Sequence, residues 1–325
     1  MLQQIIGVPV SPWVVAVAAG AVTVLTLFAL KRPRKCTSKV DLTGKTVIVT
    51  GANTGIGYYT ALDFAARNAR VILACRSKDR GQEARDKIVA ATRNENVMMR
   101  VLDLSSLSSV REFASAIKEE EDHLDILVNN AGVFGAPQKC TEDGLELNMA
   151  TNHFGPFLLT QLLLDLLKMS APSRIVNVSS GANQFIRDAD LVFDNLRAER
   201  QVSSFTKYSI TKLANILFTQ ELERRLKGTG VSVFSLHPGD VKTEIGRNLH
   251  WALKLLLLPI IPFMRTPEIG AQTSIHCAVT EGIEKLSGKY FIDCCPAEHK
   301  VSPLAKNEEL AKNLWNVSLA LTGLS

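Results

Sequence analysis

Short apolar runs rich in β-branched residues alternate with longer amphipathic stretches along most of this chain. The runs have the length of buried strands, and the stretches between them repeat apolar positions every three or four residues, as helices do. This alternation predicts βαβ units, and therefore an α/β fold with a single doubly wound parallel sheet covered by helices on both faces. Strands are expected at 45–50, 70–75, 97–102, 125–130, 174–179 and 231–236, and the predicted helices include 82–92, 110–121, 157–169 and 210–226.

The N-terminus departs from this pattern, because residues 1–30 contain no charged side chain and 13–30 are apolar or small apart from two threonines. Such a stretch at helical rise crosses most of a bilayer. A cleaved signal peptide is the alternative, but the charged region that begins such peptides is missing. Cations follow the stretch directly and favour one N-terminal transmembrane helix with the remaining chain in the cytosol; they are Lys31, Arg32, Arg34 and Lys35.

We therefore expect a membrane anchor at 1–30, a basic juxtamembrane linker at 31–43 and one catalytic domain at 44–325. The endoplasmic reticulum fits this topology best, and a mitochondrial membrane is the alternative.

The composition argues against two kinds of ligand, nucleic acids and metal ions. The 325 residues carry a net charge of only +5, part of it in the linker, which argues against nucleic acid as a partner. The six cysteines and six histidines show no metal-ligand spacing, so no metal is expected.

A glycine-rich sequence, TGANTGIG at 50–57, lies between the first predicted strand and the helical stretch after it. Gly51, Gly55 and Gly57 would let the backbone turn tightly and approach a pyrophosphate at the N-terminus of a helix. A loop with several glycines and no ligand is the alternative for this motif alone, so the rest of the chain has to decide between the two.

Three further motifs follow in a recognisable order: NNAG at 129–132, the pair Ser179 and Ser180, and Tyr208 with Lys212 four residues later. With the TGxxxGxG spacing of the glycines, they resemble the short-chain dehydrogenase/reductase family, over about 44–290. The resemblance implies a Rossmann-type fold. Within the family, the apolar N-terminus and stretches such as ILACR and TNHFGPFLLT are most similar to the membrane-bound, NADP-dependent retinol dehydrogenases, in particular the subgroup of retinol dehydrogenases 11 to 14.

The chemistry of a carbonyl reductase requires a proton donor for the oxygen and a group that holds it. Tyr208 and Lys212 share one face of a helix, so we expect the ammonium to lower the pKa of the phenol. The resemblance implies that Tyr208 is the acid/base, that Lys212 also binds the nicotinamide ribose, and that Ser180 binds the substrate oxygen, with Ser179 as the alternative. Asn152 matches the asparagine that holds a water in a proton relay.

Arg76, at the end of the second predicted strand, favours NADP(H) over NAD, because a guanidinium suits a 2′-phosphate whereas NAD binding usually places an acidic residue there. Beside the three glycines, Arg76, Tyr208 and Lys212, the resemblance implies further cofactor contacts at Asn53, Ile56, Asp103, Leu104, Asn129, Gly132, Pro238, Gly239 and Thr243.

An apolar segment at 251–264, within 244–266, lies where the family places its substrate lid. It is too short to span a bilayer, and we expect either a lid that rests on the membrane or a buried helix. The resemblance implies a lipophilic substrate and interconversion of retinol and retinaldehyde, mainly by reduction. A steroid or other lipophilic carbonyl reductase is the alternative, and a nucleotide-binding scaffold without turnover is the second. The helices at 157–169 and 210–226 resemble the family's dimer-forming pair, although packing within one chain gives the same pattern.

Overall fold

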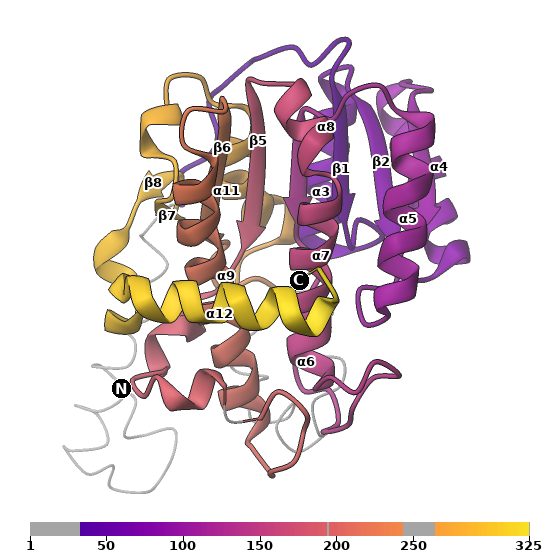
Figure 1. Cartoon of the computed structure of the whole chain (residues 1–325). Helices are drawn as coiled ribbons and strands as arrows, with labels where there is room; N and C mark the ends of the chain where they lie inside the picture. The colour runs from indigo at the N-terminus through magenta and orange to yellow at the C-terminus, as the bar shows by residue number, and fades with distance from the viewer. Residues whose placement is uncertain (1–32, 194, 243–263, 325) are drawn as a thin grey trace, which may run out of the picture.

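An eight-stranded sheet lies between two layers of helices (Figure 1) in the computed structural model, which describes residues 33–193, 195–242 and 264–324. The strands run in the order β3-β2-β1-β4-β5-β6-β7-β8, and every neighbouring pair is parallel except β7 with β8. The doubly wound sheet predicted from the sequence is confirmed. The strands are β1 Thr46–Thr50, β2 Arg70–Cys75, β3 Val97–Val101, β4 Ile126–Asn129, β5 Ser173–Val178, β6 Val231–His237, β7 Tyr290–Ile292 and β8 Cys295–Pro296.

The helices begin earlier than the apolar spacing predicts. Ser106 and Ser203 cap α5 and α9 by accepting hydrogen bonds from the backbone N–H groups of Ser109 and Thr206. The first turns behind these caps are mostly polar, with one apolar residue each before Val110 and Ile210, so the apolar spacing does not extend through them. The helices are α3 Gly55–Ala66, α4 Lys78–Thr92, α5 Leu107–Glu120, α6 Leu147–Met149, α7 Gly155–Leu162, α8 Leu164–Met169, α9 Ser204–Leu226, α11 Pro267–Val279 and α12 Glu308–Thr322.

The single helix predicted at 157–169 is wrong in detail, because the structure divides it into α7 and α8. Leu163 separates the two with ψ near 3°, outside the helical range. A π-helical turn, Ala150–Phe154, joins α6 to α7 and contains Asn152. Such π turns are uncommon and frequently mark functional positions.

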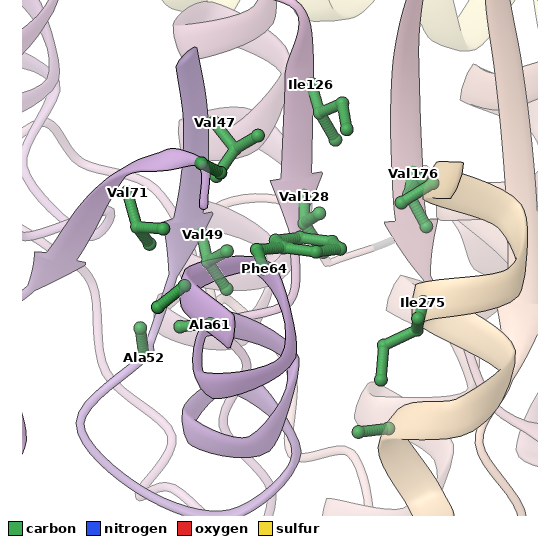
Figure 2. Packing of buried hydrophobic residues seen from close by; sticks show 14 of the residues in the cluster. Val47, Val49, Ala52, Ala61, Phe64, Val71, Ile126, Val128, Val176 and Ile275 are labelled. Carbon is green, nitrogen blue, oxygen red and sulfur yellow. The ribbon is translucent and has the colours of Figure 1, made fainter. Parts of the chain in front are cut away.

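Two apolar layers cover the faces of the sheet. Val47 and Val49 of β1 point to one face, where they pack with Phe64 of α3 and Ile275 of α11 (Figure 2). Ile48, between them in sequence, points to the opposite face, which α5, α7 and α9 cover. Successive side chains of a strand alternate between faces, so a strand buried on both must be apolar throughout. This is why β1 and its neighbours appear in the sequence as continuous apolar runs.

Helix α12 covers the outer side of α7 and α9 in the same chain (Figure 1). Trp315 packs with Phe157 and Phe218, at ring-centroid distances of 5.0 and 6.0 Å, and the Arg225 guanidinium lies 4.3 Å from its centroid. The apolar side chains of these helices therefore pack within one chain, and the expected dimer stays a prediction.

The described part of the linker, residues 33–43, lies along the domain and is not a free tether. The Arg67 guanidinium of the segment after α3 donates to the carbonyls of Ser38 and Val40, at 2.9 and 3.0 Å. The backbone N–H of Cys36 donates to Gln272 Oε1 of α11 at 3.1 Å. The expected anchor at 1–30 and nearly all of the expected lid at 244–266 lie outside the described residues. None of the helices within the described ranges has the length and apolar character needed to cross a bilayer.

Candidate active site

A pocket lies at the carboxyl edge of the sheet, where the strand order changes direction between β1 and β4. Ligands of open α/β sheets bind at this position, because the connections leave on opposite faces there. Residues that follow six different strands, β1 to β6, line it, together with side chains of α9. The predicted residues among them are Gly51, Asn53, Gly55, Ile56, Gly57, Arg76, Asp103, Leu104, Gly132, Ser179, Tyr208, Lys212 and Pro238.

The glycines form the floor of this pocket. Gly51 and Gly55 have φ values of +65° and +60°, a region that glycine adopts with the least strain. Gly57 is required for a different reason. A Cβ added to it would lie 2.4 Å from Asn130 Nδ2 and 2.5 Å from the carbonyl oxygen of Gly51. The first helical turn can therefore pass this close to the loop after β4 only because Gly57 has no side chain.

Thr50 and Asn130 hold the two loops at the centre of the pocket together. Thr50 Oγ1 accepts hydrogen bonds from the backbone N–H groups of Asn130 and Ala131, both at 3.0 Å. The Asn130 side chain donates to the carbonyl of Thr50 at 2.8 Å. These bonds connect the end of β1 to the loop after β4. Sequence analysis missed both residues, although each belongs to a motif that it identified.

The N-terminus of α3 points into the same pocket. Thr54 is its N-cap, but its side chain accepts no hydrogen bond from the first turn. The first N–H groups of a helix have no partner within the helix, and the helix dipole adds positive potential there. Gly55, Ile56 and Gly57 line the pocket at this end. The arrangement suits a bound phosphate group.

Two arginines border the far end of the pocket. Arg76 follows β2, and Arg80 lies in the first turn of α4, with Ser77 between them. Both guanidinium groups belong to exposed residues, so their charges are available to an anion. Arg76 was predicted from the sequence, and Arg80 was not. The signal for Arg80 was its position four residues after Arg76, in the first turn of the helix that follows β2.

Asp103, after β3, has its carboxylate occupied within its own turn. Its Oδ1 accepts from the backbone N–H and the hydroxyl of Ser105, at 2.9 and 2.6 Å. Leu104 follows it and lies against Gly155 of α7, where an added Cβ would come within 2.2 Å of the Leu104 carbonyl oxygen. These contacts hold the part of the pocket wall that follows β3, beside the loop after β2 that contains Arg76.

Tyr208 and Lys212 lie at the opposite end from the arginines, on the face of α9 that lines the pocket. Lys212 Nζ donates to the carbonyl of Val178 at 2.8 Å and lies 5.4 Å from the centroid of the Tyr208 ring. Phe134 packs against the other side of the site, with its ring 4.9 Å from that of Tyr208. The tyrosine is thereby fixed between an aromatic ring and a cation.

The two serines of the pair have different environments. Ser179 is buried, and its hydroxyl donates to the backbone carbonyl of Lys212 at 2.6 Å. Ser180 is half-buried, and its hydroxyl accepts a hydrogen bond from the backbone N–H of Ala182 at 3.2 Å and lies beside the Tyr208 side chain. The hydroxyl of Ser179 is engaged in fixing α9, whereas that of Ser180 lies beside the phenol.

Asn152 connects the loop after β4 to α9 with its side chain. Its Oδ1 accepts from the backbone N–H of Val133 at 2.8 Å, and its Nδ2 donates to the Val133 carbonyl and to Thr211 Oγ1, both at 3.0 Å. All of the hydrogen bonds are directed within the protein, so the side chain positions Gly132 and Lys212 relative to each other. The proton relay expected at Asn152 stays a prediction.

The expectation that Lys212 lowers the pKa of Tyr208 is wrong for this structure. Burial raises the pKa of Tyr208 to about 12, and the hydrogen bond with Ser180 opposes this only in part. Burial also lowers the pKa of Lys212 to about 8. The cost of removing each charge from water exceeds the attraction between a phenolate and an ammonium that donates to Val178 instead. Tyr208 is therefore protonated at neutral pH.

Not all predicted cofactor contacts line the pocket. The Asn129 side chain is buried and donates to Thr160 Oγ1 and Asn177 Oδ1, at 3.0 and 2.9 Å, so it joins β4 to α7 and β5. Gly239 follows Pro238 in the sequence but does not line the pocket, and Thr243 lies outside the described residues. Among the residues that the structure describes, none form a group of three potential metal ligands.

Arg265 supports the loop that contains Gly239, a role that sequence analysis missed. Its backbone N–H donates to the carbonyl of Asp240 at 2.8 Å, and its guanidinium pairs with Asp293, with one contact at 3.2 Å. Gly239 has φ of +88°, and a Cβ there would lie 2.6 Å from the guanidinium. Arg265 and Asp293 are distant in sequence from the loop, and no local pattern indicates their contact.

Replacing Gly57 by Ala should weaken NADPH binding, because the methyl group must displace Asn130 or the Gly51 carbonyl. Overpacking of this kind costs about 1–3 kcal/mol, or roughly 10–100-fold in the dissociation constant. Fluorescence titration with NADPH measures it. Gly228→Ala is the control, since its Cβ has open space at a positive φ of +82°; it should lower stability and leave affinity unchanged. Equal affinity in the Gly57 variant would contradict this account of the floor.

The low pKa of Lys212 predicts a pH dependence of stability. Between about pH 8 and 10.5, its ordinary value, the unfolded chain binds a proton that the folded chain has released. The free energy of unfolding should therefore rise with pH in this window, by at most about 1.4 kcal/mol per pH unit, relative to a Lys212→Met variant. Urea unfolding of both proteins at pH 8, 9 and 10 tests this. A constant difference would show that the folded pKa is not lowered.

Comparison with known proteins adds three results. The family model for short chain dehydrogenases matches residues 45–189. Human retinol dehydrogenase 11 is 51% identical over 89% of this chain and 89% of its own length. Human retinol dehydrogenase 13 is 48% identical over 89% of this chain and 88% of its own.

Solved structures agree with these sequence matches. An uncharacterised protein from Mycobacterium paratuberculosis has a TM-score of 0.71 and 31% identity, covering 90% of this chain and 98% of that protein. A short chain dehydrogenase from Burkholderia cenocepacia, solved in complex with NADP, has a TM-score of 0.60 and 26% identity, covering 77% and 96%. From the fold, the pocket and these matches, the chain belongs to the short-chain dehydrogenase/reductase family of oxidoreductases and resembles retinol dehydrogenases 11 to 14.

Proposed function

We propose that this protein is an NADP(H)-dependent retinol dehydrogenase that mainly reduces retinaldehyde, and other lipophilic aldehydes, from a membrane. The observation that carries the proposal is the position of Ser180 beside Tyr208 and Lys212, which line one end of a pocket whose other end has two arginines. The relatives named retinol dehydrogenase, at about 50% identity, support the retinoid as substrate.

The pocket fits a dinucleotide on two grounds from its own residues. Gly57 lets the first turn of α3 pass close to Asn130 and the Gly51 carbonyl, so that the helix N-terminus with its unpartnered N–H groups borders the pocket. Arg76 with Arg80 offers charge for a 2′-phosphate. Gly51, Gly55 and Gly57 would hold the pyrophosphate, and Lys212 the nicotinamide ribose. When bound, NADPH supplies the hydride for the carbonyl carbon.

The residues of the chain would handle the proton. Ser180 holds the carbonyl oxygen by a hydrogen bond, and the Tyr208 hydroxyl donates its proton to that oxygen as negative charge develops. The raised pKa of Tyr208 suits this direction, because the phenol remains protonated at neutral pH. The Lys212 ammonium, protonated below about pH 8, then stabilises the phenolate.

Membranes that contain the full chain test the proposal directly. All-trans-retinaldehyde with NADPH should be reduced to retinol, and NADH should support a much lower rate at equal concentration. Chromatography of the retinoids measures the product. Reduction of a steroid ketone without reduction of retinaldehyde would reject the retinoid assignment, and NADPH binding without turnover of either substrate would favour a nucleotide-binding scaffold.

The two arginines predict the cofactor preference. Replacing Arg76 and Arg80 by Ala removes charge-assisted hydrogen bonds to a 2′-phosphate, so the dissociation constant of NADPH should rise roughly 10–100-fold. The affinity for NADH, which lacks that phosphate, should stay within about threefold. Lys78→Ala is the control, because Lys78 is exposed in the same turn and does not line the pocket. An equal loss for both cofactors would contradict a role in phosphate recognition.

A further inference from the structure

Two phenylalanines beside the active site expose their rings to solvent. Phe185 is 67% exposed and Phe205 is 45% exposed, and their rings contact each other edge to face at 5.0 Å. We call them the aromatic pair. Among the described residues the other large apolar side chains that are exposed to this extent, Val101 and Met169, belong to other elements. Exposed apolar side chains that contact each other next to a binding site indicate a ligand surface.

Both rings extend from rigid backbone. Phe185 ends the short helix Gly181–Phe185 that follows Ser180. Asn183, which is fully buried, donates to the carbonyl of Ser180 at 2.8 Å and accepts from the backbone N–H of Ser302 at 2.8 Å. Phe205 lies in the capped first turn of α9. The exposure of the pair is therefore a property of the fold and is not due to a frayed segment.

The geometry of α9 connects the pair to the reacting groups. Phe205, Tyr208 and Lys212 have the spacing i, i+3 and i+7, so they lie on one face of the helix. Tyr208 and Lys212 line the pocket, and Phe205 lies one turn before them, outside its lining. Phe205 is about 4.5 Å from Tyr208 along the axis. A substrate with its carbonyl oxygen between Ser180 and Tyr208 could thus extend its carbon chain directly onto the pair.

We propose that the aromatic pair of Phe185 and Phe205 binds the apolar chain of the substrate and selects long lipophilic carbonyl compounds over short ones. The inference rests on the proposed function, and it deepens that function by assigning residues to substrate length. Covering both rings with an extended hydrocarbon chain removes apolar surface from water on the protein and on the ligand. A short aldehyde reaches Tyr208 and Ser180 without touching the pair, so it gains nothing from them.

A double Phe185→Ala, Phe205→Ala variant tests the proposal, with Met169→Ala as the control because Met169 is 71% exposed on α8, away from the site. The KM for retinaldehyde should rise about tenfold in the double variant, with kcat within about twofold. Kinetics with propanal and the dissociation constant of NADPH should be unchanged. A Phe185→Leu, Phe205→Leu variant should recover most of the affinity. An unchanged KM for retinaldehyde, or an equal loss with propanal, would overturn the proposal.

Two more measurements separate the remaining explanations. Retinaldehyde binding in the presence of NADP+, a pair that cannot react, followed by quenching of protein fluorescence, should weaken about tenfold in the double variant. It therefore tests the pair even where wild-type protein reduces no aldehyde, a result that would contradict only the proposed function. Retinaldehyde delivered in detergent micelles and in phospholipid vesicles should show the same loss. A loss seen only with vesicles would mean that the pair contacts the membrane, and would overturn the substrate site.

Discussion

The contact between the loop after β1 and the loop after β4 is the constraint on which the rest of the site depends. Thr50 and Asn130 hold these loops together by hydrogen bonds, and Gly57 lets the first turn of α3 enter the space that remains. The positions of the helix N-terminus and of the pocket floor follow from this contact. The separation of the two ends of the pocket also follows from it, because the arginines come after β2, whereas the residues proposed to react come after β5 and lie on α9.

Desolvation is the second constraint, and it determines the protonation states at the reacting end. Burial raises the pKa of Tyr208 and lowers that of Lys212, so the pocket keeps the phenol neutral and holds an ammonium that is close to losing its proton. Asn152 and Ser179 fix α9 against β5 and the loop after β4. These hydrogen bonds position Lys212 without adding charge to the site. The Lys212 ammonium is retained there because it donates to the Val178 carbonyl.

Short sequence patterns predicted those features of the fold and the site that depend on residues close together in the sequence. The apolar runs identified the buried strands, and the spacing of Gly51, Gly55 and Gly57 identified the floor, because both features are encoded within a few residues. Contacts between distant residues were not predictable in this way. Arg265 supports Gly239, and Asn129 points into the core between Thr160 and Asn177, and neither arrangement leaves a trace in neighbouring sequence. The pKa of Tyr208 was mispredicted because spacing on a helix reports the nearby cation but not the loss of water.

The central claim is that Tyr208 delivers the proton to a carbonyl oxygen held at the end of a nucleotide pocket. Single-turnover mixing of the NADPH-loaded full chain with retinaldehyde tests it most directly, with wild type compared to Tyr208→Phe and NADPH binding measured on both. The account predicts unchanged NADPH affinity and a rate of NADPH oxidation that falls by a factor of roughly 10²–10⁴, the contribution of a positioned general acid. A Tyr208→Phe variant that oxidises NADPH at the wild-type rate would contradict it.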